Sequence, residues 1–150
     1  MERERHLVLV IDDQIGKPDS PDRTAFLRAV GYYSKDGSEE PVAGYPYDFE
    51  FHTGQANGGD NSVEVVKTAV ERRWPDADGR RWALVLLDVR FGDDESFGFT
   101  LLRALRDDFK FGKDLPIVML TSGPGTYSFS LTVTDAAGNQ ATDTATIILQ

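Results

Sequence analysis

This 150-residue sequence lacks cysteine, long apolar runs and, in its C-terminal part, any positive charge. Without cysteine the chain forms neither disulfides nor thiolate metal sites, which is usual for proteins of the reducing cytoplasm. The apolar run at residues 7–11 is too short for a signal peptide or a membrane span. We therefore expect a soluble, cytoplasmic protein that has no membrane partner.

Negative charge predominates, with 25 Asp and Glu against 16 Lys and Arg and a net charge of −9. Affinity for nucleic-acid phosphates comes mainly from clustered Lys and Arg, so we expect no direct nucleic-acid partner. All 16 basic residues lie at or before Lys113. The residues that follow therefore differ in composition from the rest of the chain.

Short apolar runs alternate with helical patterns over residues 1–122. This alternation is typical of βα units and a parallel sheet, so these residues are predicted to form an α/β domain. Asn61, three residues before Glu64, is the expected N-cap of the second helix. The predicted strands cover residues 6–11, 47–53, 82–88 and 115–120, and the predicted helices cover 21–30, 61–74 and 99–109.

Residues 123–150 follow a different pattern, in which apolar and polar side chains alternate with period two. Tyr127, Phe129 and Leu131 share one face of a strand, and a Gly-Asn turn precedes a second, Thr-rich strand. The pattern predicts an antiparallel β-hairpin. It resembles the terminal hairpin of PKD-type or related bacterial immunoglobulin-like domains, which are β-sandwiches. An isolated hairpin is marginal in water, so we expect it to pack on the first domain, to pair with another chain or to remain loosely ordered.

Acidic side chains stand at the ends of two predicted strands. Asp12 and Asp13 follow the first strand, and Asp88 ends the third. The carboxyl ends of parallel strands share one sheet edge, where three carboxylates repel one another unless a cation lies between them. Mg²⁺, a hard ion that prefers oxygen ligands, is the expected occupant. The sequence thus predicts an acidic metal pocket.

Four motifs in the first 122 residues resemble the receiver domain of bacterial two-component response regulators. They are Val-Ile-Asp-Asp-Gln at 10–14, Leu-Leu-Asp-Val-Arg at 86–90, Phe-Gly-Phe at 97–99 and Leu-Pro-Ile-Val-Met-Leu-Thr-Ser at 115–122. The resemblance implies a flavodoxin-like parallel sheet, here truncated after the fourth strand and followed by the hairpin.

The same resemblance implies a role for each site residue. Asp88 would be the phosphoacceptor, and Thr121 would turn its hydroxyl toward the phosphoryl group. Asp12, Asp13, Asp88 and the backbone carbonyl of Arg90 would hold Mg²⁺. A histidine kinase or a phosphotransfer protein would be the partner, and phosphorylation would switch a protein interaction. On this interpretation the chain is a signalling module and not a turnover enzyme.

One feature of receivers is missing, because they carry a Lys after a fifth strand and no Lys or Arg follows Lys113 here. An alternative is therefore a chimeric or truncated binding or structural protein whose pocket binds a divalent metal without phosphorylation. A phosphohydrolase that forms an aspartyl-phosphate is disfavoured, since Asp12-Asp13-Gln14 lacks the expected Asp-x-Asp arrangement. The exposed edge of an incomplete sheet, or the hairpin, would also favour self-association.

Overall fold

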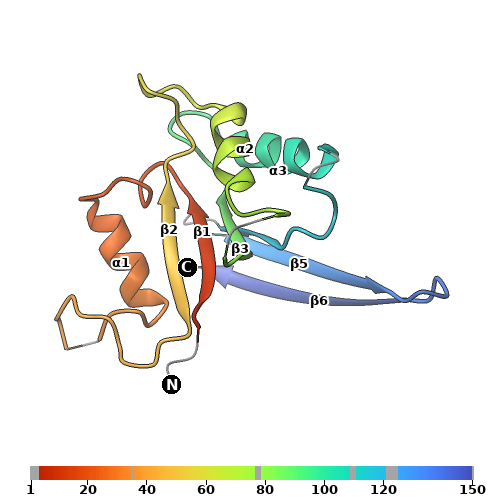
Figure 1. The fold of residues 1–150 in the computed structure, drawn as a ribbon, viewed down its shortest axis with the longest axis horizontal. Coiled ribbons are helices and arrows are strands. Elements are labelled where there is room, and N and C mark those ends of the chain that lie inside the picture. Colours follow the sequence, from red (N-terminus) through yellow and green to blue (C-terminus); the bar gives the residue numbers. More distant parts are fainter. Residues whose placement is uncertain (1–3, 35, 77–78, 109–110, 121–124, 150) are drawn as a thin grey trace. The chain divides into compact units, whose positions relative to one another are not determined.

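The computed structural model describes residues 4–34, 36–76, 79–108, 111–120 and 125–149 (Figure 1). The chain divides into two compact units, residues 1–120 and 121–150. None of the helices in the described residues is long and apolar enough to cross a membrane.

The first unit is a four-stranded, all-parallel sheet with helices between its strands, as the alternating pattern predicts. The strands lie in the order β2-β1-β3-β4. In chain order the elements are β1 (His6–Ile11), α1 (Pro21–Ala29), β2 (Tyr47–His52), α2 (Val63–Glu71), β3 (Trp82–Asp88), α3 (Phe97–Asp107) and β4 (Ile117–Leu120).

Several predicted boundaries are wrong by a few residues, for local reasons. The predicted cap Asn61 is incorrect, because Ser62 caps α2 by accepting a hydrogen bond from the amide of Val65 at 3.3 Å. Strand β4 begins at Ile117 and not at residue 115, since Pro116 lacks the N–H that strand pairing needs. The start of the first helix is predicted correctly, since Ser20 caps α1 and Pro21 occupies its first turn.

Helices α2 and α3 cover one face of the sheet, and α1 covers part of the other. Side chains alternate between faces along a strand, and the odd-numbered residues of β1 belong to the main core with residues of α2 and α3. This core includes Leu7, Leu9, Ile11, Val66, Val70, Val85, Leu87, Leu101 and Leu105, all at most 3% exposed. Each buried Leu or Val contributes on the order of 2 kcal/mol through the hydrophobic effect.

On the opposite face, aromatic contacts join α1 to β2. Phe26 packs edge-on against Phe49 and Phe51, with ring centroids 5.6 and 6.3 Å apart. Phe49 and Phe51 are in register with Val8 and Val10 of β1, which are fully buried. The helix and the strand order therefore place the carboxyl end of β1 in the middle of the sheet, between β2 and β3.

In the second unit, β5 (Gly125–Thr134) and β6 (Gln140–Leu149) pair antiparallel over their whole lengths. The turn between them is organised by Asp135, whose carboxylate accepts hydrogen bonds from Ala137 N, Asn139 N and Asn139 Nδ2 at 2.9, 2.9 and 3.0 Å. These bonds, first among them the one from the Asn139 side chain, lower the pKa of Asp135. Gly138 follows with a positive φ of 88°, which only glycine adopts readily.

The start of α3 packs directly on the end of β3, at Gly98. Its amide donates to the carbonyl oxygen of Val89 at 2.9 Å. A Cβ added at Gly98 would lie 1.9 Å from the carbonyl oxygen of Asp88, which is backbone and cannot move aside cheaply. Glycine is therefore required here for α3 to approach the residue that ends β3.

We predict that Gly98→Ala destabilises the protein by about 3 kcal/mol or more, because the backbone of β3 or α3 must shift to admit the methyl group. Urea denaturation followed by circular dichroism measures the change. Gly44→Ala is the control: its Cβ would meet nothing within 4 Å, so it should lose only about 1 kcal/mol from its positive φ. Equal losses in the two variants would contradict the proposed close packing.

Candidate metal centre

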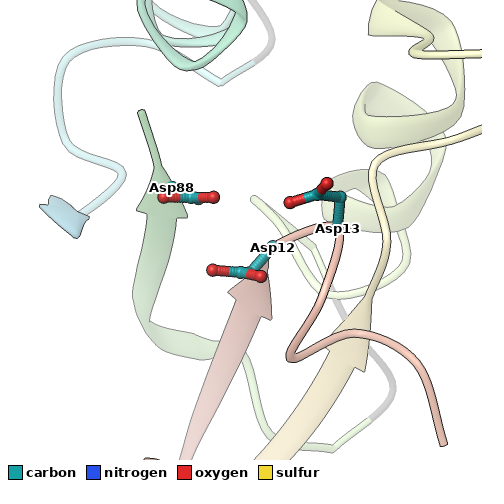
Figure 2. Close-up of side chains that lie close together, drawn as sticks. All are labelled: Asp12, Asp13 and Asp88. Carbon is teal, nitrogen blue, oxygen red and sulfur yellow. The ribbon is translucent and has the colours of Figure 1, made fainter. Parts of the chain in front are cut away.

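Three buried carboxylates meet at the carboxyl ends of β1 and β3. Asp12 and Asp13 follow β1, and Asp88 is the last residue of β3. Because Ile11 is in register with Leu87 on the neighbouring strand, the chain places Asp12 beside Asp88. One oxygen from each carboxylate lies within 4.8 Å of the others, and the three residues are only 8, 5 and 9% exposed. Figure 2 shows the three side chains converging at this edge.

The loop after β1 fixes the carboxylate of Asp12. Its Oδ1 accepts hydrogen bonds from the amides of Gln14 and Ile15, both at 2.8 Å. The amide of Gly16 donates to the carbonyl oxygen of Asp12, also at 2.8 Å. A carboxylate that caps its own following turn in this way is held in one orientation. One oxygen of Asp12 is thus engaged by two backbone amides.

The loop after β3 holds the other two carboxylates. Oδ2 of Asp13 accepts from the amide of Gly92 at 2.8 Å and from Gln14 Nε2 at 3.3 Å. Oδ1 of Asp88 accepts from the amide of Val89 at 2.9 Å. The bond between Gly92 and Asp13 ties the β3–α3 loop to the β1–α1 loop, so a change at one carboxylate reaches both loops.

Burial and like charge dominate the electrostatics of the site. Burial, followed by the negative charge of Asp12 and then of Asp13, raises the pKa of Asp88 to about 7, against the opposing hydrogen bond from Val89. None of the ion pairs between described residues includes Asp12, Asp13 or Asp88. At neutral pH and without a cation, Asp88 is therefore partly protonated. An all-oxygen, anionic, buried donor set fits a hard divalent ion such as Mg²⁺.

The remaining predicted site residues are Arg90 and Thr121. Arg90 lies in the β3–α3 loop, where its Nε donates to the carbonyl oxygen of Gly92 at 3.1 Å. No hydrogen bond between described residues uses the carbonyl oxygen of Arg90. Thr121 lies outside the described residues. Its chain neighbour Leu120 is in register with Asp88, and Leu120 O accepts from Val89 N at 3.1 Å.

Sequence reasoning missed several residues that shape the site. The side chain of Asn61 is not a helix cap, and instead contacts Gln55 and the carbonyl oxygen of Phe91, both at 3.3 Å. The amide of Gly92 donates a hydrogen bond to Asp13, and Gly92 itself has a positive φ of 58°. The position of Gly92 in an acidic loop was the available signal for a special backbone conformation. Nothing in the sequence indicated the partner of its amide.

The raised pKa of Asp88 predicts a pH dependence of stability in the metal-free protein. Its folded pKa of about 7 exceeds the ordinary value of 3.8, so between these pH values the folded state binds the extra proton. Stability due to Asp88 is therefore complete below pH 3.8 and is lost as pH rises through about 7. Since a tenfold change in proton affinity is worth about 1.4 kcal/mol, the loss is on the order of 4 kcal/mol.

Urea denaturation between pH 4 and 8, with a chelator present, measures this dependence. Asp88→Asn should remove it and should make the metal-free protein more stable than the wild type above pH 7. Asp93→Asn, an exposed change in the next loop, should leave the wild-type profile intact. Parallel profiles for the wild type and Asp88→Asn would show that Asp88 ionises normally.

The chain was compared with known proteins at the level of families, sequences and folds. A scan against models of protein families, a search of curated proteins and a search of solved structures each gave no match. The observations that bear on function are therefore those of the site itself: three buried carboxylates, their backbone donors, and the loops that carry them.

Proposed function

We propose that this chain is a phosphoacceptor module of the receiver type, in which Asp88 is phosphorylated in a Mg²⁺-dependent reaction. The observation that carries the proposal is the convergence of Asp12, Asp13 and Asp88 at the ends of adjacent parallel strands. The strand order β2-β1-β3-β4 supports a flavodoxin-like topology, since it equals the first four positions of the order 2-1-3-4-5. Three of the motifs that resemble receivers lie at the end of β1, at the end of β3 and at the start of α3.

The residues around the cluster suit a magnesium site. Asp12, Asp13 and Asp88 would supply carboxylate oxygens, and Arg90 would supply its backbone carbonyl oxygen. When bound, Mg²⁺ would neutralise negative charge on the phosphoryl oxygens during transfer. The cation would also offset the burial and the like charges of Asp12 and Asp13 that raise the pKa of Asp88, so that Asp88 becomes an available carboxylate nucleophile at neutral pH.

Asp88 is positioned for the transfer step. Its Oδ1 is held by the amide of Val89, which leaves Oδ2 as the attacking atom. With a phosphohistidine donor, a bond forms between Oδ2 and phosphorus while the phosphorus–nitrogen bond breaks. The electron pair leaves with the imidazole nitrogen, and the donor histidine returns to its neutral form after taking up a proton. The product is an acyl phosphate on a buried side chain, with limited access for hydrolytic water.

The new charge would act on the two loops that meet at the site. A phosphoryl group adds about 1.5 to 2 negative charges and strong acceptor oxygens. Repulsion of Asp13 would strain its bond to Gly92 and so alter the 91–94 turn, which is closed by hydrogen bonds between Phe91 and Asp94 at 2.9 and 3.0 Å. The hydroxyl of Thr121 is the proposed donor to the phosphoryl group. The module would therefore act as a cytoplasmic interaction switch controlled by a histidine kinase or a phosphotransfer protein.

A second candidate is a chimeric or truncated binding protein that binds the metal without being phosphorylated. It is favoured by the absence of any Lys or Arg after Lys113. A receiver uses such a cation to pair with the phosphoryl group. In the sequence, the paired strands β5 and β6 also follow β4, where a receiver would continue with a further βα unit. The two candidates share the metal site and differ in the reactivity of Asp88.

Intact-mass spectrometry after incubation with acetyl phosphate and Mg²⁺ separates the two candidates. The phosphoacceptor proposal predicts that the wild type gains the mass of one phosphoryl group. Asp88→Asn should gain nothing, and Asp93→Asn, which alters only the exposed acidic loop, should be labelled like the wild type. An unlabelled wild type that still binds Mg²⁺ would favour the metal-binding alternative. An unlabelled wild type that binds no divalent ion would rule out both.

The metal site itself is tested by Asp12→Asn. Asparagine keeps an acceptor oxygen for the amides of Gln14 and Ile15 but removes one negative charge, so the loop is preserved while the affinity for Mg²⁺ falls by about tenfold or more. Titration calorimetry measures the affinity, and thermal unfolding with and without Mg²⁺ measures the linked stabilisation. Asp94→Asn is the control for loss of a nearby exposed charge. Unchanged affinity in Asp12→Asn would place the ion elsewhere.

A further inference from the structure

We propose that Arg23 is a positioning residue for the candidate metal centre, holding the loop that presents Asp12 in its ligand-binding conformation. The inference rests on the proposed metal site and adds to it a residue that touches neither the carboxylates nor the ion. Arg23 stands in the first turn of α1, two residues after Pro21. Its side chain returns to the loop that connects β1 to α1.

Arg23 binds two successive carbonyl groups of that loop. Its Nε donates to Ile15 O at 2.9 Å, and its Nη2 donates to Gly16 O at 2.7 Å. The guanidinium carbon lies 4.1 Å from the ring centroid of Phe51 on β2, which fixes its plane from one side. Hydrogen bonds from a charged donor are about twice as strong as neutral ones. The guanidinium therefore joins the helix, the loop and the neighbouring strand.

The same two loop residues also hold Asp12. Ile15 donates its amide to Asp12 Oδ1 while its carbonyl accepts from Arg23 Nε. Gly16 donates its amide to Asp12 O while its carbonyl accepts from Arg23 Nη2. Because each of the two residues bridges Arg23 and Asp12, rotation of either residue away from Arg23 also weakens its hydrogen bond to Asp12.

The loop has little freedom on its other side. A Cβ at Gly16 would lie 2.4 Å from Asp12 O and 2.5 Å from His52 O, so the backbone passes close to the ends of β1 and β2. A cation in the first turn of a helix is disfavoured by the helix dipole. Burial also lowers the pKa of Arg23, an effect opposed by the charge of Asp19. The position of Arg23 is thus unfavourable for the helix alone and is explained by its bonds to the loop.

Arginine has the geometry that this task requires. Its planar fork donates in two fixed directions and stacks on an aromatic ring, whereas the lysine ammonium is a compact point charge without such a fork. Arg23→Lys should therefore keep the positive charge and lose the simultaneous hydrogen bonds to the carbonyl oxygens of Ile15 and Gly16. Arg23→Gln removes the charge as well. The pair of variants separates an electrostatic role of Arg23 from a geometric one.

The test measures Mg²⁺ affinity by titration calorimetry on the full chain, at a temperature where each variant is folded by circular dichroism. Arg23→Gln should weaken binding by about tenfold or more, in the range found when groups that orient metal ligands are removed. Arg23→Lys should recover part of the loss. Arg28→Gln is the matched control, since Arg28 lies on the same helix and its exposed side chain makes one hydrogen bond among the described residues, to Gly37 O at 3.1 Å. It should bind Mg²⁺ within about twofold of the wild type.

Amide hydrogen exchange gives a readout that does not depend on the metal. In the metal-free protein, Arg23→Gln should speed hydrogen exchange at the amides of Gln14 and Ile15, which donate hydrogen bonds to the carboxylate of Asp12. The exchange rate at the amide of Val70 in α2 should not change. Wild-type exchange at Gln14 and Ile15, or wild-type affinity in Arg23→Gln, would overturn the role of Arg23. If Arg23→Gln does not fold, wild-type affinity in Arg23→Lys overturns it equally.

The outcomes also separate this inference from the proposed function. If the wild type binds no Mg²⁺, both the proposed metal centre and the positioning role of Arg23 are wrong. A wild type that binds Mg²⁺ but is not phosphorylated leaves the role of Arg23 open to the same test. Equal losses of affinity in Arg23→Gln and Arg28→Gln would reduce the effect to general charge and overturn the inference.

Discussion

The repulsion among three buried carboxylates is the constraint on which the rest of this structure depends. Asp12, Asp13 and Asp88 are held together by strands and loops, in a place where no described basic side chain pairs with them. Left to themselves, such groups separate or bind protons. Burial, followed by the negative charges of Asp12 and Asp13, raises the pKa of Asp88. Keeping the three carboxylates together therefore lowers the stability of the metal-free protein, at a site that is suited to a cation.

The carboxylates are kept in place by backbone amides and not by opposite charges. Gln14 and Ile15 donate to Asp12, Gly92 donates to Asp13, and Val89 donates to Asp88. Amide donors orient a carboxylate without cancelling its charge, so the site keeps its attraction for a cation. An Arg or Lys paired directly with these groups would relieve the repulsion and compete with a metal. The charge of Arg23 does not compete with a metal in this way, because the guanidinium donates to loop carbonyls and not to the carboxylates.

Metal binding and phosphorylation make different demands on the chain. Metal binding needs only oxygen ligands at one point, and the loops after β1 and β3 bring them together. Phosphorylation also needs groups that stabilise the transferred phosphoryl charge. The composition of the chain after Lys113 offers no cation for that purpose. The proposed phosphoacceptor role therefore depends on the bound metal ion and on hydroxyl and amide donors. This dependence is greater than in a receiver that carries the usual lysine.

Local patterns in the sequence determined the alternation of strands and helices, because apolar periodicity and turn residues act over a few neighbours. They also placed Asp12, Asp13 and Asp88 at strand ends, and the geometry of parallel sheets then put those ends on one edge. The cap at Asn61 was predicted wrongly because Ser62 competes for the same role, and long-range contacts to Gln55 and Phe91 engage the Asn61 side chain instead. Element boundaries shifted for similar local reasons, as at Pro116.

Only the tertiary structure decided which strands are neighbours, and therefore that Asp12 lies beside Asp88 in the centre of the sheet. It decided that Gly92 donates to Asp13 across 79 residues of chain, and that Arg23 turns back to Ile15 and Gly16 over Phe51. The pKa of Asp88 belongs with these features. Burial and the approach of like charges are products of packing between distant segments, and no local pattern of residues encodes them.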